Sequence, residues 1–164
     1  TEAAYGGAGW EVSPGEDRYR RALYTFAKRS APFAAANTFD APSGEACVAR
    51  RELSNTPLQS LTLLNDEAFV EAAQALGRLA ADGAGDDRAR MIRIFRQCLT
   101  RMPQDREVAV LLALLHDTRG RLDRGELTAA DIAGNAGSAP VAERAAWTVV
   151  ARALLNLDET ITKS

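Results

Sequence analysis

The chain has 164 residues, a length that suits one domain built around a single hydrophobic core. Its 20 basic and 22 acidic residues are interspersed and leave a net charge of −2, so we expect no nucleic-acid partner. The longest apolar run, residues 108–115, is far shorter than the roughly 20 residues of a membrane-spanning helix. We therefore expect a single helical domain over residues 1–164 that does not itself span a membrane.

The chain begins with a stretch rich in glycine and proline, which predicts an extended N-terminal arm over residues 1–16. From Asp17 to Ser30, aromatic and apolar residues recur at helical spacing among arginines, and this pattern predicts a first helix. Pro32 ends that helix, because the residue before a proline is disfavoured in the helical region. We expect residues 31–55 to form a long ordered loop.

The next predicted helix begins at Pro57, with Thr56 as its cap, because proline at the first helical position loses no hydrogen bond. Asn65 or Asp66 then either breaks this helix or caps a second one. The segment is therefore either two helices or one bent helix. The apolar stripe of this second part predicts a buried face, formed by Phe69, Val70, Ala73, Leu76 and Ala80. The sequence Asp82-Gly83-Ala84-Gly85 ends it.

Two further helices are expected around Pro103. The first begins at Asp86 or Asp87 and has an apolar face, made of Met91, Ile92, Phe95, Cys98, Leu99 and Met102. Pro103 ends it and opens the second, which Arg119-Gly120 closes. The second has its own stripe, made of Val108, Leu111, Leu112 and Leu115.

Residues 123–139 are predicted to be a connector with only a short turn at Thr128–Ala133. The last predicted helix runs from Pro140 to about Asn156 and is apolar on nearly all sides, which places it in the middle of a bundle. No stretch alternates like a strand. The fold class is therefore predicted to be all-α, an irregular bundle of about five helices with a long ordered loop and an extended N-terminal arm.

Catalytic and metal-binding patterns are missing from the sequence. The two cysteines, Cys47 and Cys98, form no zinc or haem-attachment motif, so we expect no metal and no cofactor bound by this chain. A disulfide between them and two separate buried thiols remain alternatives. The single histidine, His116, is expected near a helix C-terminus, where the helix dipole explains it, and one histidine is too few for a serine triad or a histidine metal site. We assign no catalytic residue and expect no enzyme.

The stretch from Asn37 to Asp66 holds the remaining candidates. Asp40 suits a turn in which its carboxylate accepts backbone N–H bonds, and one of Arg50 and Arg51 is expected to pair with Asp40 or Glu52. On this interpretation the set organises the loop. The alternative is an anion- or sugar-binding surface, formed by Arg50, Arg51 and Asn55 with Arg20 or Arg21. The aromatic residues Trp147, Phe26, Phe39 and Phe69 are expected in the core rather than in a stacking platform.

Four blocks of sequence occur in an order typical of one family. They are YRRALYTFAKRSAP (Tyr19–Pro32), TFDAP (Thr38–Pro42), CVARRELSNTPLQSLTLLND followed by FVEAA (Cys47–Ala73), and AAWTVVARALLNLDETITK (Ala145–Lys163). Together they resemble the C-terminal domain of unknown function of large planctomycete-type cytochrome-c-like surface proteins. The chain is similar to the C-terminal portion of that domain, and its residues 82–140 match only as a loose helical pattern.

This resemblance implies a context. It implies export to the periplasm or cell surface, a haem that belongs to a partner rather than to this chain, and a link to polysaccharide breakdown. A part of the domain that is missing here would cover apolar surface, so we expect the chain to dock on a larger protein or complex through its N-terminal arm and first helix.

Two functions therefore follow as expectations. The first is a non-catalytic interaction or scaffolding module in a larger extracytoplasmic, haem-containing assembly. The alternative is an accessory carbohydrate- or anion-binding part of a polysaccharide-degrading enzyme system. A broad apolar surface favours the first, and a cleft in which arginine and aromatic side chains converge favours the second.

Overall fold

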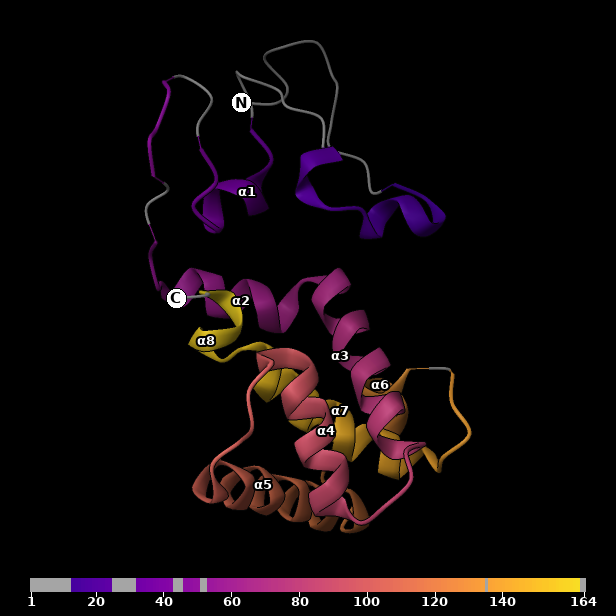
Figure 1. Ribbon diagram of the computed structural model, residues 1–164. Helices are drawn as coiled ribbons and strands as arrows, with labels where there is room; N and C mark the ends of the chain where they lie inside the picture. The colour runs from indigo at the N-terminus through magenta and orange to yellow at the C-terminus, as the bar shows by residue number, and fades with distance from the viewer. Residues whose placement is uncertain (1–12, 25–31, 43–45, 51–52, 135, 163–164) are drawn as a thin grey trace. The chain divides into compact units, whose positions relative to one another are not determined.

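The computed structural model describes residues 13–24, 32–42, 46–50, 53–134 and 136–162, and within these ranges every regular element is a helix. Five long α-helices confirm the predicted all-α fold (Figure 1). The elements are the 3₁₀-helices η2 (Gly15–Tyr19) and η3 (Ala22–Tyr24) and the α-helices α1 (Ala34–Thr38), α2 (Pro57–Asn65), α3 (Glu67–Ala81), α4 (Asp87–Leu99), α5 (Asp105–Asp123), α6 (Ala129–Ala133), α7 (Val141–Leu155) and α8 (Asp158–Ile161).

The chain divides into two compact units, Thr1–Thr62 and Leu63–Ser164, with the boundary inside α2. We call them unit 1 and unit 2. The single domain expected over residues 1–164 stays a prediction. Most of the expected N-terminal arm and the second half of the first predicted helix, including Phe26, lie outside the described residues, as do Arg51 and Glu52.

The prediction of a helix from Asp17 to Ser30 is wrong over residues 17–24, the part that the structure describes. The structure has η2 and η3 there instead, separated by Arg20 and Arg21. The backbone of Arg20 is extended (φ −67°, ψ 150°). Tyr19, Leu23 and Tyr24 are exposed. A short helix needs a buried apolar face for most of its stability, so the helical spacing alone does not maintain an α-helix here.

The expected loop over residues 31–55 contains one short helix, α1. Its chain leaves the helix through Phe39 and then Asp40, which has a positive φ of 56°. Aspartate tolerates this left-handed backbone better than most residues with a side chain. The turn directs the chain toward the segment that precedes α2.

Local capping sets the boundaries between the following helices. At the start of α2, the Gln59 backbone N–H donates to Thr56 Oγ1 (3.3 Å) and the Thr56 N–H donates to Gln59 Oε1 (3.1 Å), which is a reciprocal capping box. Asp66 accepts from the Ala68 N–H at 3.0 Å and caps α3. Of the two alternatives, two separate helices is therefore correct. Asp86 caps α4 in the same way.

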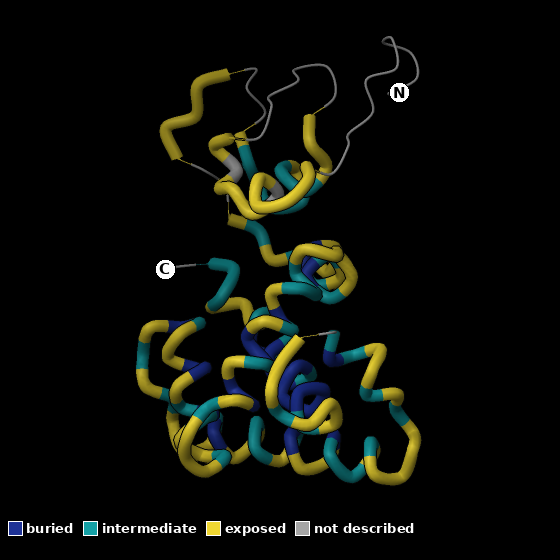
Figure 2. Tube along the Cα trace, turned by 90° about the vertical axis from the view of Figure 1, so that its right-hand side faces the viewer, coloured by how far each residue is buried: buried dark blue, intermediate teal, exposed yellow. Residues whose placement is uncertain are grey.

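Unit 2 has a hydrophobic core around α7, which packs against α3, α5 and α6. Trp147 is completely buried, as predicted, whereas Phe69 is half-buried on α3. Gly77 on α3 faces Thr148, and a Cβ at Gly77 would lie 2.7 Å from the Thr148 backbone nitrogen. The absence of a side chain at Gly77 therefore lets α3 and α7 approach closely. All buried hydrophobic residues among the described residues belong to unit 2 (Figure 2).

Several boundaries and faces in unit 2 differ from the predictions. α5 continues through Gly120 to Asp123, so His116 lies inside the helix, exposed, rather than near its C-terminus. Arg119 makes ion pairs with other helices and holds this last part of α5. Met102 is 61% exposed because α4 already ends at Leu99, and Ile94 is buried instead.

Two short helices complete unit 2. The turn predicted at Thr128–Ala133 forms α6 within the connector, with Thr128 at its N-cap position. The sequence patterns did not predict α8, which follows α7 after a single turn. α8 contacts both α4 and α7.

Candidate functional site

Asp40 lies at the centre of a polar network in unit 1, which we call the Asp40 junction (Asp40, Ser54 and Gln59). Asp40 Oδ2 accepts the Ser54 backbone N–H at 2.8 Å, and the Ser54 hydroxyl lies 2.8 Å from both Asp40 carboxylate oxygens. The Gln59 amide nitrogen is 3.3 Å from Asp40 Oδ2. Three donors therefore converge on one carboxylate. The sequence analysis chose Asp40 but did not name Ser54 or Gln59. The expected pairing of Arg50 or Arg51 with Asp40 or Glu52 stays a prediction, because Arg51 and Glu52 lie outside the described residues.

Gln59 connects this junction to α2. Its side chain is 1% exposed, and its amide nitrogen also donates to the Thr38 carbonyl (2.9 Å) and lies 3.1 Å from Ser54 Oγ. Its amide oxygen caps α2. Buried polar groups are stable when they are hydrogen-bonded in this way. The junction closes the segment from Thr38 to Ser54, but it contains no imidazole that would activate the Ser54 hydroxyl as a nucleophile.

The second feature of unit 1 is an exposed surface around Tyr24. Arg20 Cζ lies 5.8 Å and Arg21 Cζ 6.0 Å from the centre of the Tyr24 ring, which is the range of cation–π interactions. Arg20 Nε also donates to Asp17 Oδ1 at 2.6 Å. Tyr19 and Leu23 are exposed on the same two 3₁₀-helices. We call Tyr19, Arg20, Arg21, Leu23 and Tyr24 the Arg–Tyr surface.

The structure places the other predicted site residues as follows. Arg50 and Asn55 are exposed in unit 1. Cys47 is an exposed free thiol in unit 1, and Cys98 is a half-buried free thiol in unit 2. Burial raises the pKa of the Cys98 thiol above its ordinary value. A disulfide between the two cysteines stays a prediction.

Unit 2 contains an ion network that sequence reasoning missed. Arg119 donates to both carboxylate oxygens of Asp87 (2.5 and 3.0 Å) and to both of Glu143 (2.9 and 2.5 Å). The Trp147 indole N–H donates to Glu143 at 2.9 Å. Hydrogen bonding by Arg119 lowers the pKa of Asp87, and Asp87 and Glu143 together raise the pKa of Arg119. The network ties α4, α5 and α7 together and has all its charges paired, which indicates a structural role.

A similar network surrounds Arg101, between α4 and α5. Arg101 bonds both oxygens of Glu107 (2.9 and 2.7 Å) and both of Glu159 (2.7 Å each), and it stacks on Phe95 at 5.0 Å. The bonds from Arg101 to Glu107, together with the bond from the Gln104 backbone N–H, lower the pKa of Glu107 to about 2. The network fastens α8 to α5.

Arg144 is a buried arginine that binds backbone carbonyl groups rather than carboxylates. It is 6% exposed and donates to the carbonyl oxygens of Ala139 (3.1 Å), Gly134 (3.4 Å) and Ala136. Asp82 supports the same loop by accepting the Ser138 hydroxyl and the Ala139 N–H, both at 2.8 Å. This role of Arg144 was not predictable from the sequence, because backbone carbonyl acceptors carry no sequence signature.

Over the ranges that the structure describes, no group of three or more histidine, cysteine, aspartate or glutamate side chains is placed to hold a metal ion. In the same ranges, no helix has the length and apolar character to cross a membrane.

Comparison with known proteins gives one match. The model of the PSD1 family, described as a protein of unknown function (DUF1553), matches residues 3–115, which is more than half of the chain. The chain belongs to the PSD1 family. The matched residues include the Arg–Tyr surface and the Asp40 junction, and they end within α5. The Ala145–Lys163 block noted in the sequence lies beyond the match. No curated protein and no solved structure matches the chain.

Proposed function

We propose that this PSD1 chain is a non-catalytic interaction module and that unit 1 docks on a partner protein through the Arg–Tyr surface. One observation carries the proposal. Among the described residues of unit 1, Gln59 is the only buried residue, whereas several large apolar side chains are exposed. These are Tyr19, Leu23, Tyr24, Phe33, Val48, Leu53, Leu58 and Leu61. Exposed apolar groups in such number are typical of surfaces that another molecule covers.

The chemistry of the Arg–Tyr surface suits a protein partner. Leu23 is 81% exposed, more than any other large apolar residue described, and Tyr24 beside it is 60% exposed. Tyrosine and arginine are enriched at the centres of protein interfaces, where an aromatic ring fills a pocket and a guanidinium meets carboxylates. A complementary partner would offer an apolar pocket bordered by acidic side chains.

The proposal includes the context that the resemblance implies. The partner belongs to a larger assembly in the periplasm or at the cell surface, with a c-type haem in the partner and none in this chain. On this view the chain corresponds to the C-terminal portion of the domain found in cytochrome-c-like surface proteins of the planctomycete type. Membership of the PSD1 family supports the relationship to that domain.

Site-specific photocrosslinking in the cells that make the protein tests the proposal. A photoreactive phenylalanine analogue at position 23 is expected to give a covalent adduct with one protein. The same analogue at position 110 is the matched control, because Val110 on α5 is 62% exposed in unit 2. Equal adducts at both positions, or none at position 23, would contradict the docking surface. A haem stain of the adduct and its recovery from the periplasmic or surface fraction test the context separately.

A second function, an accessory carbohydrate- or anion-binding module, has one observation in its favour. Arg20 and Arg21 both approach the Tyr24 ring, and an aromatic ring beside guanidinium groups can stack on a sugar that carries acidic substituents. Titration of the full chain with neutral and with uronic-acid oligosaccharides would separate the two functions. The Tyr24→Ala variant should lose oligosaccharide binding if this second function is correct, and unchanged binding would reject it.

A further inference from the structure

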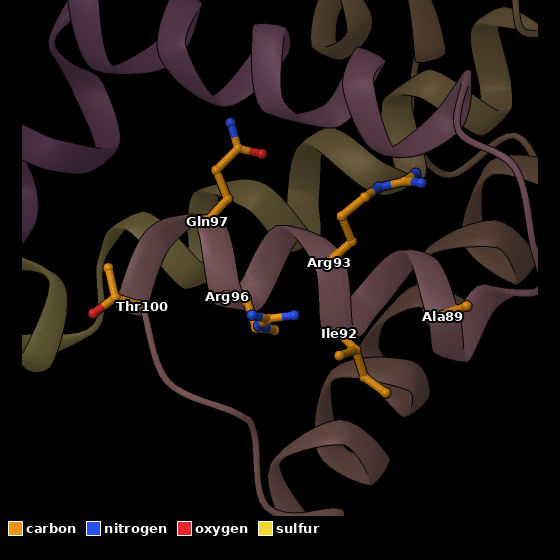
Figure 3. Close-up of a pocket in the computed structure, with 6 residues that line it drawn as sticks. All are labelled: Ala89, Ile92, Arg93, Arg96, Gln97 and Thr100. Carbon is orange, nitrogen blue, oxygen red and sulfur yellow. The ribbon is translucent and has the colours of Figure 1, made fainter.

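A second surface, on α4 in unit 2, has features that neither proposed function uses. Residues of α4 line an open hollow of about 580 Å³ (Figure 3). They are Ala89, Ile92, Arg93, Arg96, Gln97 and Thr100. The hollow is shallow and open to solvent. We call it the α4 hollow.

The arginines of the α4 hollow differ from the other two arginines of the same helix. Arg88 pairs with Asp105 at 2.6 Å, and Arg90 lies 3.7 Å from Glu143. Among the described residues, Arg93 and Arg96 form no ion pair, and no acidic side chain lines the hollow. Two uncompensated positive charges therefore lie about one helical turn apart along α4, in a chain whose net charge is negative.

The turn after α3 contributes to the position of Arg93. A Cβ built on Gly83 would lie 1.6 Å from Arg93 Nη2, so the guanidinium passes directly over the glycine. The absence of a side chain at Gly83 thus provides the space that Arg93 occupies. Figure 3 shows the side chains of Arg93 and Gln97 on one side of α4 and that of Arg96 on another.

Hydrogen-bond donors are the main polar groups of the α4 hollow. Arg93 and Arg96 each present a fork of N–H groups, and Gln97 adds an amide. The Thr100 hydroxyl already donates to the Leu99 carbonyl at 2.7 Å, so its oxygen adds no further donor. Ile92 is half-buried and forms an apolar part of the lining. Guanidinium forks bind carboxylate and phosphate groups in a bidentate manner.

We propose that the α4 hollow binds a small ligand that carries two or more oxyanion groups, with Arg93 and Arg96 each holding one of them. Two anionic groups fit better than one, because the two guanidinium groups point in different directions and would each bind a separate group. The proposal concerns unit 2 and does not depend on the docking of unit 1.

Titration of the isotope-labelled full chain, followed by nuclear magnetic resonance at low salt, tests this site. The probes are tripolyphosphate and citrate, which distinguish a phosphate ligand from a carboxylate ligand. We expect at least one of them to shift the backbone amides of Arg93, Arg96 and Gln97 in a saturable manner. Because the site is exposed, added salt should weaken binding.

Three variants make the result specific. Arg93→Gln and Arg96→Gln should each weaken binding about threefold and the double variant about tenfold, the scale of exposed charge interactions. Arg106→Gln is the control, since Arg106 is exposed on α5 outside the hollow and its substitution removes the same charge. It should leave the affinity unchanged. The proposal is overturned if neither probe binds, or if Arg106→Gln weakens binding as much as Arg93→Gln.

Discussion

Unit 2 and unit 1 are organised by different interactions. In unit 2, α7 places a wholly buried tryptophan among apolar side chains from the surrounding helices, and Arg119 beside this core is paired with Asp87 and Glu143. In the described part of unit 1, one buried glutamine and its polar partners connect the segments, and most of the large apolar side chains are exposed. Apolar burial is the dominant favourable term in folding. Unit 2 therefore has a buried core that can stabilise it by itself, whereas unit 1 exposes apolar side chains that a partner protein could cover.

The strongest test of this contrast is Trp147→Ala in unit 2. The variant should lower the free energy of unfolding by about 3–5 kcal/mol, because it leaves a large cavity. It also removes the indole N–H from Glu143. Denaturant unfolding followed by circular dichroism measures the change. Tyr24→Ala is the matched control, an aromatic truncation at an exposed site of unit 1, and should change the free energy by less than about 0.5 kcal/mol. Similar losses of free energy of unfolding in the two variants would contradict the contrast between a buried core in unit 2 and an exposed apolar surface in unit 1.

A smaller effect is expected from Asp40→Asn in unit 1. Asparagine also tolerates the positive φ at this position, but the substitution removes the negative charge to which three donors hydrogen-bond. The free energy that stabilises the Asp40 junction should therefore fall by about 1–2 kcal/mol. Hydrogen exchange of the Ser54 amide should become about tenfold faster, while amides in α7 keep their protection. Glu16→Gln, an exposed substitution in the same unit, is the control. An unchanged Ser54 exchange rate would show that the Asp40 junction does not hold unit 1 together.

Acid should weaken unit 2 through Glu107. Its folded pKa is about 2, below its ordinary value of 4.5, so its stabilising effect is complete above about pH 4.5 and is lost as the pH falls toward 2. The loss should be about 1 kcal/mol after solvent screening. Denaturant unfolding at several pH values measures it. In Glu107→Gln this part of the pH dependence should disappear, and an identical acid response in both proteins would show that Glu107 does not titrate as proposed.

The sequence predicted those features of the fold that depend on neighbouring residues. Thr56 caps α2 as predicted, and Asp66 and Asp86 cap α3 and α4, each being one of two neighbouring residues that the sequence left open. Such caps are predictable because a cap and the N–H group whose hydrogen bond it accepts lie within three residues. The pairing of Arg119 with Asp87 and Glu143 was not predictable, because the partners are 32 and 24 residues away and no local pattern marks them.

The same reason explains the results at the candidate site. The turn at Asp40 was predictable from the neighbouring proline, whereas its partner Ser54 lies 14 residues away and Gln59 lies 19. The prediction of a first helix from Asp17 was wrong for another reason. Amphipathic spacing predicts a helix only when the apolar face is buried, and Tyr19, Leu23 and Tyr24 remain exposed.

The smallest expected effect is also the sharpest test of what the exposed side chains of unit 1 are for. Leu23→Ser should change the free energy of unfolding by less than about 0.5 kcal/mol, because a side chain that is 81% exposed contributes little apolar burial. Leu58→Ser on α2, where the leucine is 59% exposed, should change the free energy of unfolding by a similarly small amount. Leu115→Ser, at a fully buried position of α5, is the reference and should cost at least as much as a leucine-to-alanine change in a core, about 2–5 kcal/mol. If Leu23→Ser were as costly as Leu115→Ser, Leu23 would be part of a core, and the Arg–Tyr surface would have no free apolar group with which to bind a partner.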